Sequence, residues 1–210
     1  MDGTGKPNEE RSRPDLRDAI LRASLEIGTE FGEDGLTMRA IASRLGLSVT
    51  ALYQHYDGKP SILRGLNLWG ADRLALHLAP AHDLVDPVAR LVDESVRYVR
   101  WACENPWLYR LMFQGDEIDW RTFTDAERDR LLSSNLRTVR AFQEAIAAGR
   151  LRADVDVQTA PFMMWAANHG LSTLILGGRI SEHHPVFPVA DRDAFVQAFA
   201  VGFIRGFEVR

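Results

Sequence analysis

The side chains in residues 37–59 are suited to hydrogen bonding with phosphates and base edges rather than to catalysis. Thr37 and Ser48 each precede a short segment of helical periodicity, so each hydroxyl is placed to cap a helix whose free amides can also receive a phosphate. The residues at the start of the second segment are short or branched, as a close approach of backbone to base edges requires. They are Ser48, Val49, Thr50 and Ala51.

Two predicted short helices joined by a tight turn position these side chains. The helices cover residues 37–45 and 48–54, and Gly46 supplies the left-handed residue that ends the first. The spacing is typical of a helix-turn-helix, in which the second helix enters the major groove of DNA. Small and apolar residues are expected to pack the pair: Ala42, Leu45, Leu47 and Leu52.

Residues 36–63, LTMRAIASRLGLSVTALYQHYDGKPSIL, resemble the DNA-binding segment of the TetR family of bacterial regulators. The family pattern appears as Thr37, Ala42–Ser48, Leu52-Tyr53, Tyr56 and Lys59, with Tyr56 at a usual phenylalanine and Pro60 at a usual glutamate. The resemblance implies phosphate contacts from Thr37, Ser48, Tyr53, His55 and Lys59. It also implies groove contacts from Arg39, Val49, Thr50 and Ala51.

Other roles stay open for four of these residues. The hydroxyl of Tyr53 has the alternative of packing against the first helix, and Lys59 that of a solvated surface position. Arg39 is equally consistent with solvation and with a base contact. For His55, contact and no contact are evenly balanced.

Composition argues against three classes of protein: disordered chains, general polyanion binders and membrane-spanning proteins. The 210 residues are 46% hydrophobic, enough to bury a core, and the net charge of −4 argues against a general polyanion binder. No stretch approaches the roughly 18 apolar residues of a membrane span, and the polar N-terminus does not read as a signal peptide, so we expect a cytoplasmic protein. Cys103 is the only cysteine, which excludes an intramolecular disulfide and favours a small core residue.

The periodicity predicts an all-α fold of about nine helices and no sheet. We expect a flexible tail over 1–13, a three-helix DNA-binding domain over 14–74 with its helix-turn-helix at 37–56, and a regulatory and dimerisation domain over 75–210. Pro161 falls in the first turns of the penultimate helix, where it either kinks the helix or delays its start. The first expected helix is capped by Asp15 and ends at Gly32, and a Thr124–Glu127 capping box begins the seventh, which reaches Ala148. The fourth begins at Lys59 and ends before Pro80. The other expected helices cover residues 37–45, 48–54, 87–105, 107–113, 157–177 and 192–208.

Large polarizable side chains gather in the C-terminal two-thirds, where they form either an ordinary core or the wall of an apolar pocket. Residues 105–113 and 168–178 resemble the C-terminal domain of a TetR subgroup named for a Trp-His-Gly motif, with Asn168 in place of the tryptophan. His169 is either a polar anchor in the wall or a satisfied core histidine. The predicted ligand-binding residues are Trp101, Phe113, Phe142, Met163, Trp165 and His169.

The last helix has an aromatic row beside a row of small residues, and mid-helix glycine costs about 1 kcal/mol relative to alanine. Close approach of a second copy offsets that cost, and packing within one subunit is the alternative. A homodimer also matches the family's usual assembly and palindromic half-sites. The predicted dimer interface comprises Phe195, Ala198, Phe199, Gly202, Phe203 and Gly206.

Taken together, the sequence predicts a DNA-binding transcriptional regulator, a repressor released from operator DNA by a small apolar or aromatic effector. We expect no catalytic residues, cofactor, metal site or membrane contact, since nucleotide-binding and hydrolase motifs are missing and His183-His184 lacks ligand-spaced partners. The alternatives are an all-α enzyme and a helical adaptor, each with an accessory helix-turn-helix.

Overall fold

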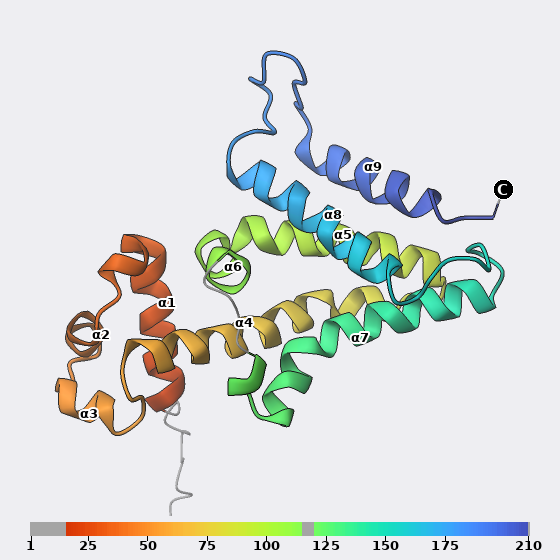
Figure 1. Ribbon diagram of the computed structural model, residues 1–210. Coiled ribbons are helices and arrows are strands. Elements are labelled where there is room, and N and C mark those ends of the chain that lie inside the picture. Colours follow the sequence, from red (N-terminus) through yellow and green to blue (C-terminus); the bar gives the residue numbers. More distant parts are fainter. Residues whose placement is uncertain (1–15, 115–119, 210) are drawn as a thin grey trace, which may run out of the picture. The chain divides into compact units, whose positions relative to one another are not determined.

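The computed structural model describes residues 16–114 and 120–209, and within these ranges the regular structure is helical (Figure 1). The all-α fold of nine helices is confirmed for the described residues. The predicted tail and the Asp15 cap lie outside them. No described helix is long and apolar enough to cross a membrane. The helices are α1 (Leu16–Gly35), α2 (Met38–Leu45), α3 (Val49–Tyr53), α4 (Lys59–His82), α5 (Pro87–Glu104), α6 (Pro106–Phe113), α7 (Asp125–Ala147), α8 (Ala160–Leu176) and α9 (Arg192–Arg205), with a 3-10 turn at Trp120–Thr122.

The chain divides into two compact units between Leu66 and Asn67, a point inside α4. The predicted division after residue 74 lies in the same helix. In the first unit, α1 buries a stripe that includes Ile20 and Ile27, and Leu36, Ile41 and Leu52 are buried in the same unit. Gly32 has a φ of 71°, so regular helix is interrupted where the sequence predicts its end.

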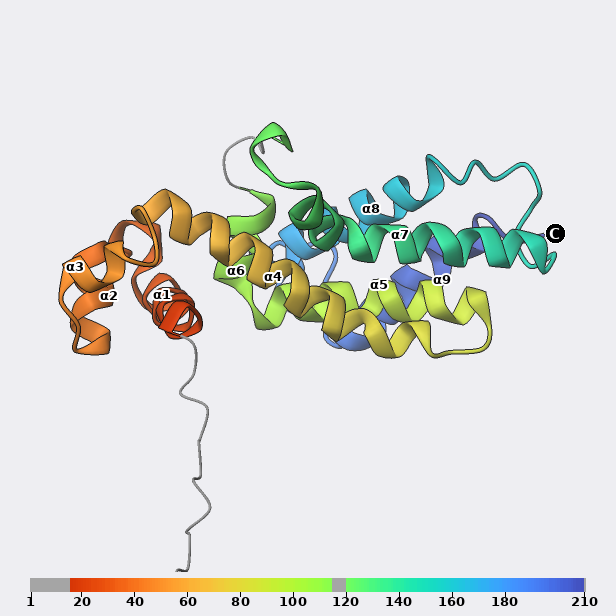
Figure 2. The ribbon, with the colours of Figure 1, turned by 90° about the horizontal axis from the view of Figure 1, so that it is seen from below.

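In the second unit α7, α8 and α9 each pack on α5, and Figure 2 shows α5 and α7 lying side by side. The buried face of α5 carries both apolar and polar side chains, from Val88 to Ala102. Near its N-terminal end, Leu91 packs in one cluster with Phe142 of α7, Met164 of α8 and Ile204 of α9. This cluster joins the four helices.

Two prolines affect helix limits differently. The prediction that the fourth helix ends before Pro80 is wrong, because α4 continues through Pro80 to His82. A proline in the last turn removes only one backbone hydrogen bond, which the helix tolerates there. Pro161 stands in the first turn of α8, where no amide partner is needed, so it delays the start of the helix to Ala160.

Candidate nucleic-acid interface and regulatory site

The turn between α2 and α3 has the geometry that the sequence predicts. Gly46 adopts φ 66° and ψ 31°, a left-handed conformation that suits glycine, and its N–H donates to the last turn of α2. The Thr37 Oγ1 accepts from the Ala40 amide at 3.1 Å, and the Ser48 Oγ accepts from the Ala51 amide at 3.1 Å. The two hydroxyls therefore fix where each short helix begins.

Ion pairs hold α2 against α1. The Arg44 guanidinium donates to Glu30 through two nitrogens, at 2.8 and 3.3 Å, and to Glu26 at 3.3 Å. These hydrogen bonds lower the pKa of Glu30 and raise that of Arg44. Such exposed ion pairs add little stability, but the bidentate contact between Arg44 and Glu30 sets the orientation of α2 on α1. The Gly46 turn then sets the direction of α3 relative to α2.

The predicted DNA-contacting residues share one unit and differ in exposure. Thr37, Arg39, Ser48, Thr50 and Tyr53 are exposed, whereas Val49, Ala51, His55 and Lys59 are half-buried. Tyr53 is 52% exposed, so its side chain is largely in solvent, and the aromatic residue that packs in this unit is Tyr56, with Arg17 stacked on its ring.

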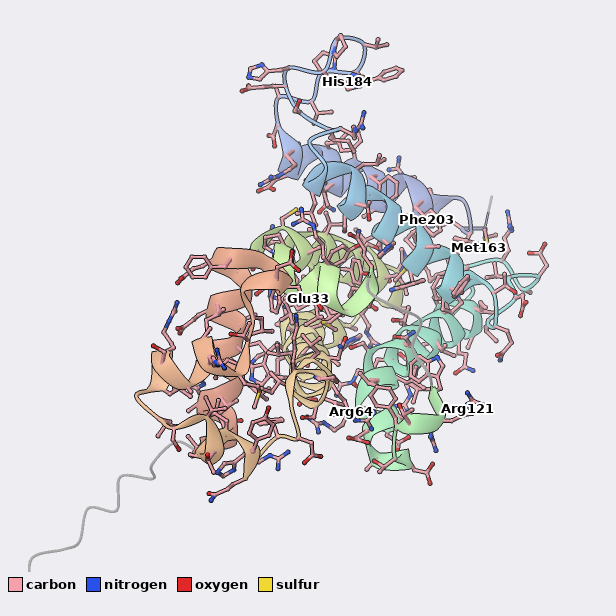
Figure 3. All side chains as sticks on the ribbon, turned by 60° about the vertical axis from the view of Figure 1, so that its left-hand side comes forward. Glu33, Arg64, Arg121, Met163, His184 and Phe203 are labelled. Atoms are coloured by element: carbon pink, nitrogen blue, oxygen red, sulfur yellow. The ribbon has the colours of Figure 1, made fainter. Side chains whose placement is uncertain are left out.

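Lys59 is engaged at the start of α4. Its Nζ donates to the Glu33 backbone carbonyl at 2.7 Å and lies 3.5 Å from the Glu33 carboxylate, which Figure 3 labels. The side chain therefore ties the end of α1 to the start of α4. This pairing leaves the ammonium half-buried rather than freely solvated.

Two family models match the chain. Residues 20–66 match bacterial regulatory proteins of the tetR family, and residues 95–200 match the Tetracyclin repressor-like C-terminal domain. The chain belongs to the TetR family. An HTH-type transcriptional regulator of Mycobacterium tuberculosis, Rv1816, is 30% identical over 161 residues, which is 68% of this chain and 62% of that relative. The class C tetracycline repressor of Escherichia coli is 42% identical over 50 residues, 24% of this chain and 23% of the repressor.

Two solved structures agree with the fold. A protein of unknown function from Rhodococcus sp. RHA1 superposes with a TM-score of 0.80 at 26% identity, covering 96% of this chain and all of that one. The ketosteroid regulator KstR2 of M. tuberculosis gives a TM-score of 0.65 at 17% identity, covering 94% and 97% of the two chains. The second likeness concerns the fold alone.

In the second unit, five rings meet between α5, α6 and α8. This ring cluster consists of Tyr98, Tyr109, Phe113, Trp165 and His169. His169 stacks on Trp165 at 5.3 Å and on Tyr109 at 5.4 Å, and Phe113 lies 6.2 Å from Trp165 between ring centroids. The Tyr109 hydroxyl is hydrogen-bonded to His169 Nδ1 at 2.7 Å. Burial lowers the pKa of His169, which favours a neutral imidazole.

The structure brings together Phe113, Trp165 and His169 of the six predicted ligand-binding residues. Phe142 lies in the cluster around Leu91, edge-on to Phe207, and Met163 is 47% exposed on α8 (Figure 3). Trp101 is buried on α5, about three helical turns after Leu91. The groove between α5 and α9 is lined by none of the six.

Two buried polar residues of α5 were not predicted from the sequence: Tyr98, which belongs to the ring cluster, and Glu94, one helical turn before it. Glu94 and Tyr98 of α5 are each 5% exposed, and the Glu94 Oε2 and Tyr98 hydroxyl have no hydrogen-bond partner. Burial raises the pKa of Glu94 to about 7 despite a hydrogen bond from Thr138. The sequence signal for this pair is an acid and a tyrosine four residues apart, which places both on one face of a helix, and that face is mostly apolar.

The predicted dimer face on α9 is open in the isolated chain. Ala198, Gly202 and Gly206 are exposed, and a side chain added at Gly202 meets no atom within 4 Å. The aromatic row is half-buried beside them, with Phe199 and Phe203 stacked at 6.5 Å between centroids. On α8, Gly170 is open in the same way, and Leu174 is exposed.

Replacing the buried acid, Glu94→Gln, should stabilise the protein more at pH 8 than at pH 5. The folded pKa of about 7 exceeds the ordinary value of 4.5, so stability is lost as pH rises between these values. Removing the charge should restore about 2 to 3 kcal/mol more at pH 8 than at pH 5. Urea unfolding at both pH values measures this, with the exposed Glu104→Gln as the control. Equal changes at the two pH values would contradict the assignment.

Proposed function

We propose that this TetR-family protein is a dimeric repressor that binds a palindromic operator in the cytoplasm and leaves it when a small molecule occupies the regulatory unit. The observation that carries the proposal is the helix-turn-helix, in which a left-handed Gly46 turn and two hydroxyl caps present exposed Ser48 and Thr50 at the leading end of α3. Short side chains there allow close approach to the floor of a major groove.

Two kinds of DNA contact follow from this placement. We assign groove contacts to the leading end of α3 and to Arg39 at the start of α2, and phosphate contacts to the other predicted DNA-contacting residues. The exposed hydroxyls of Tyr53 and Thr37 suit phosphates, and Lys59 supplies a positive charge. The groove set is Arg39, Val49, Thr50 and Ala51, and the phosphate set is Thr37, Ser48, Tyr53, His55 and Lys59.

A two-fold dimer would give the spacing that a palindrome needs. The open small-residue row on α9, with Gly170 on α8, allows backbones of two copies to approach closely, and the half-buried Phe195, Phe199 and Phe203 would be covered. Two recognition helices about 34–36 Å apart fit successive major grooves.

Release requires a ligand that prefers another dimer shape. To move the equilibrium from 1:99 to 99:1, the ligand must favour the non-binding shape by about 5.5 kcal/mol, or about half of this at each of two identical sites. Pockets of modest affinity can supply such a difference.

The experiment that tests the proposal is in-vitro selection of genomic DNA fragments bound by the full chain. The expected result is a palindrome with half-sites one helical turn apart, or a multiple of it. Selection that recovers no common sequence would favour a helical adaptor without operator DNA.

Lys59→Ala should weaken binding to every DNA sequence by a similar factor and reduce the slope of log affinity against log salt by about one, because one phosphate contact is lost. Fluorescence anisotropy across a salt series measures both. Glu33→Gln is the control, since it removes the ionic partner of Lys59 and leaves the lysine in place. If the control reproduces the loss, Lys59 acts through its ion pair with Glu33 and not through a phosphate.

Thr50→Ala should alter the preference among operator variants, because an exposed side chain in the groove touches particular bases. We expect a loss of about 1–3 kcal/mol on the best operator and a smaller loss on a variant changed at the contacted base pair. Binding to a panel of single-base operator variants measures this. A uniform loss over the panel would reassign Thr50 to the DNA backbone.

Gly202→Leu should yield a monomer, because a bulky side chain on the small-residue row holds two α9 helices apart. Operator affinity should fall with it, since one half-site alone binds weakly. Sedimentation velocity measures the oligomeric state, and circular dichroism checks that helix content is kept. Ala147→Leu, which introduces the same side chain at an exposed position of α7, is the control. A stable Gly202→Leu dimer would refute this face.

A further inference from the structure

The Glu94 carboxylate is buried without a full set of partners. One oxygen accepts a hydrogen bond from the Thr138 hydroxyl of α7, and the other, Oε2, has none. Burying a carboxylate with a free oxygen opposes folding, so the group is retained at a cost that an apolar residue would avoid. A donor that reaches Oε2 would recover part of that cost.

A second free polar atom lies on the same face of α5. Tyr98 follows Glu94 by four residues, one helical turn or a rise of about 6 Å. Its hydroxyl is buried and without a hydrogen-bond partner. Its ring belongs to the ring cluster, 6.1 Å from Phe113 and 6.2 Å from Tyr109 between centroids. One unsatisfied oxygen therefore belongs to a residue of the ring cluster, and the other lies one helical turn before it on α5.

The charge around Glu94 indicates which donor fits. Among the described residues, only the Thr138 hydrogen bond acts to lower the pKa of Glu94, and no arginine contributes. Arg97, on the same helix, pairs with Asp93 at 2.6 Å. An anionic ligand would find no cation here and would be repelled by the ionised carboxylate. A neutral donor would be served as well by glutamine, whereas a positive charge specifically favours a carboxylate.

Resting on the proposed regulatory function, we propose that the effector is a lipophilic amine, whose ammonium group pairs with Glu94 Oε2 while its apolar part lies against the ring cluster. The electron-rich faces of tyrosine and tryptophan also attract cations, so Tyr98 and Trp165 suit the region beside the ammonium. The amine supplies the donors that both free oxygens lack.

The test uses three probes with the same ring and different head groups: 2-naphthylmethylamine, 2-naphthylmethanol and 2-naphthoic acid. Calorimetry with the full chain should show that the amine binds at least tenfold tighter than the alcohol and that the acid does not bind. Glu94→Gln, which keeps the shape and removes the charge, should weaken amine binding at least tenfold. The control is Glu104→Gln, the same substitution at the exposed end of α5, and this variant should bind the amine as tightly as the parent chain does.

Acid binding equal to that of the amine, or a parent chain that does not bind the amine at millimolar concentration, would overturn the proposal. So would amine binding unchanged by Glu94→Gln, since the free oxygen would then be satisfied by water alone. Tyr98→Phe, which removes only the hydroxyl, should cause a smaller loss of about threefold. Operator binding is measured separately by anisotropy without any probe, so failure of the repressor function is seen independently of amine binding.

Discussion

The central position of α5 is the constraint on which the second unit depends. Because α7, α8 and α9 all pack on this helix, three of its polar residues, Glu94, Ser95 and Tyr98, are buried. Ser95 accepts a hydrogen bond from Asn168 of α8 at 3.1 Å. Glu94 and Tyr98 are buried as well, but Glu94 Oε2 and the Tyr98 hydroxyl have no hydrogen-bond partner. This is the one stretch of α5 where buried polar atoms lack hydrogen bonds. Such unpaired atoms are expected where a fold keeps a site for something else.

In the DNA-binding unit the corresponding constraint is local. Five residues of α3 cannot hold a helix by themselves, because nucleation costs more than so few hydrogen bonds return. The Ser48 cap, the buried Leu52 and the Gly46 turn supply what propensity does not. Arg44 then fixes α2 against α1 through exposed charges that matter for direction more than for stability.

These differences explain what could be predicted from the sequence. Helices with strong caps were placed well, since Thr37, Ser48 and the Thr124–Glu127 capping box are local signals. The continuation of α4 through Pro80 was missed because proline statistics do not distinguish a last turn from an interior. Sorting the aromatic residues needed tertiary partners, since Phe142 and Phe113 look alike in sequence but pack in different clusters. Glu94 was missed because apolar residues alone defined the face of α5.

Helix α8 links the two proposed regulatory surfaces. One side of it carries Trp165 and His169 into the ring cluster, and its other side exposes Gly170 and Leu174. A ligand among the rings can alter a dimer only if its binding free energy differs between two positions of a shared element. Because Asn168 of α8 donates a hydrogen bond to Ser95 of α5 between these sides, any rotation or sliding of α8 that separates the two residues would cost a buried hydrogen bond. A ligand that acts on the dimer through α8 therefore has to move α5 and α8 together or offset that cost.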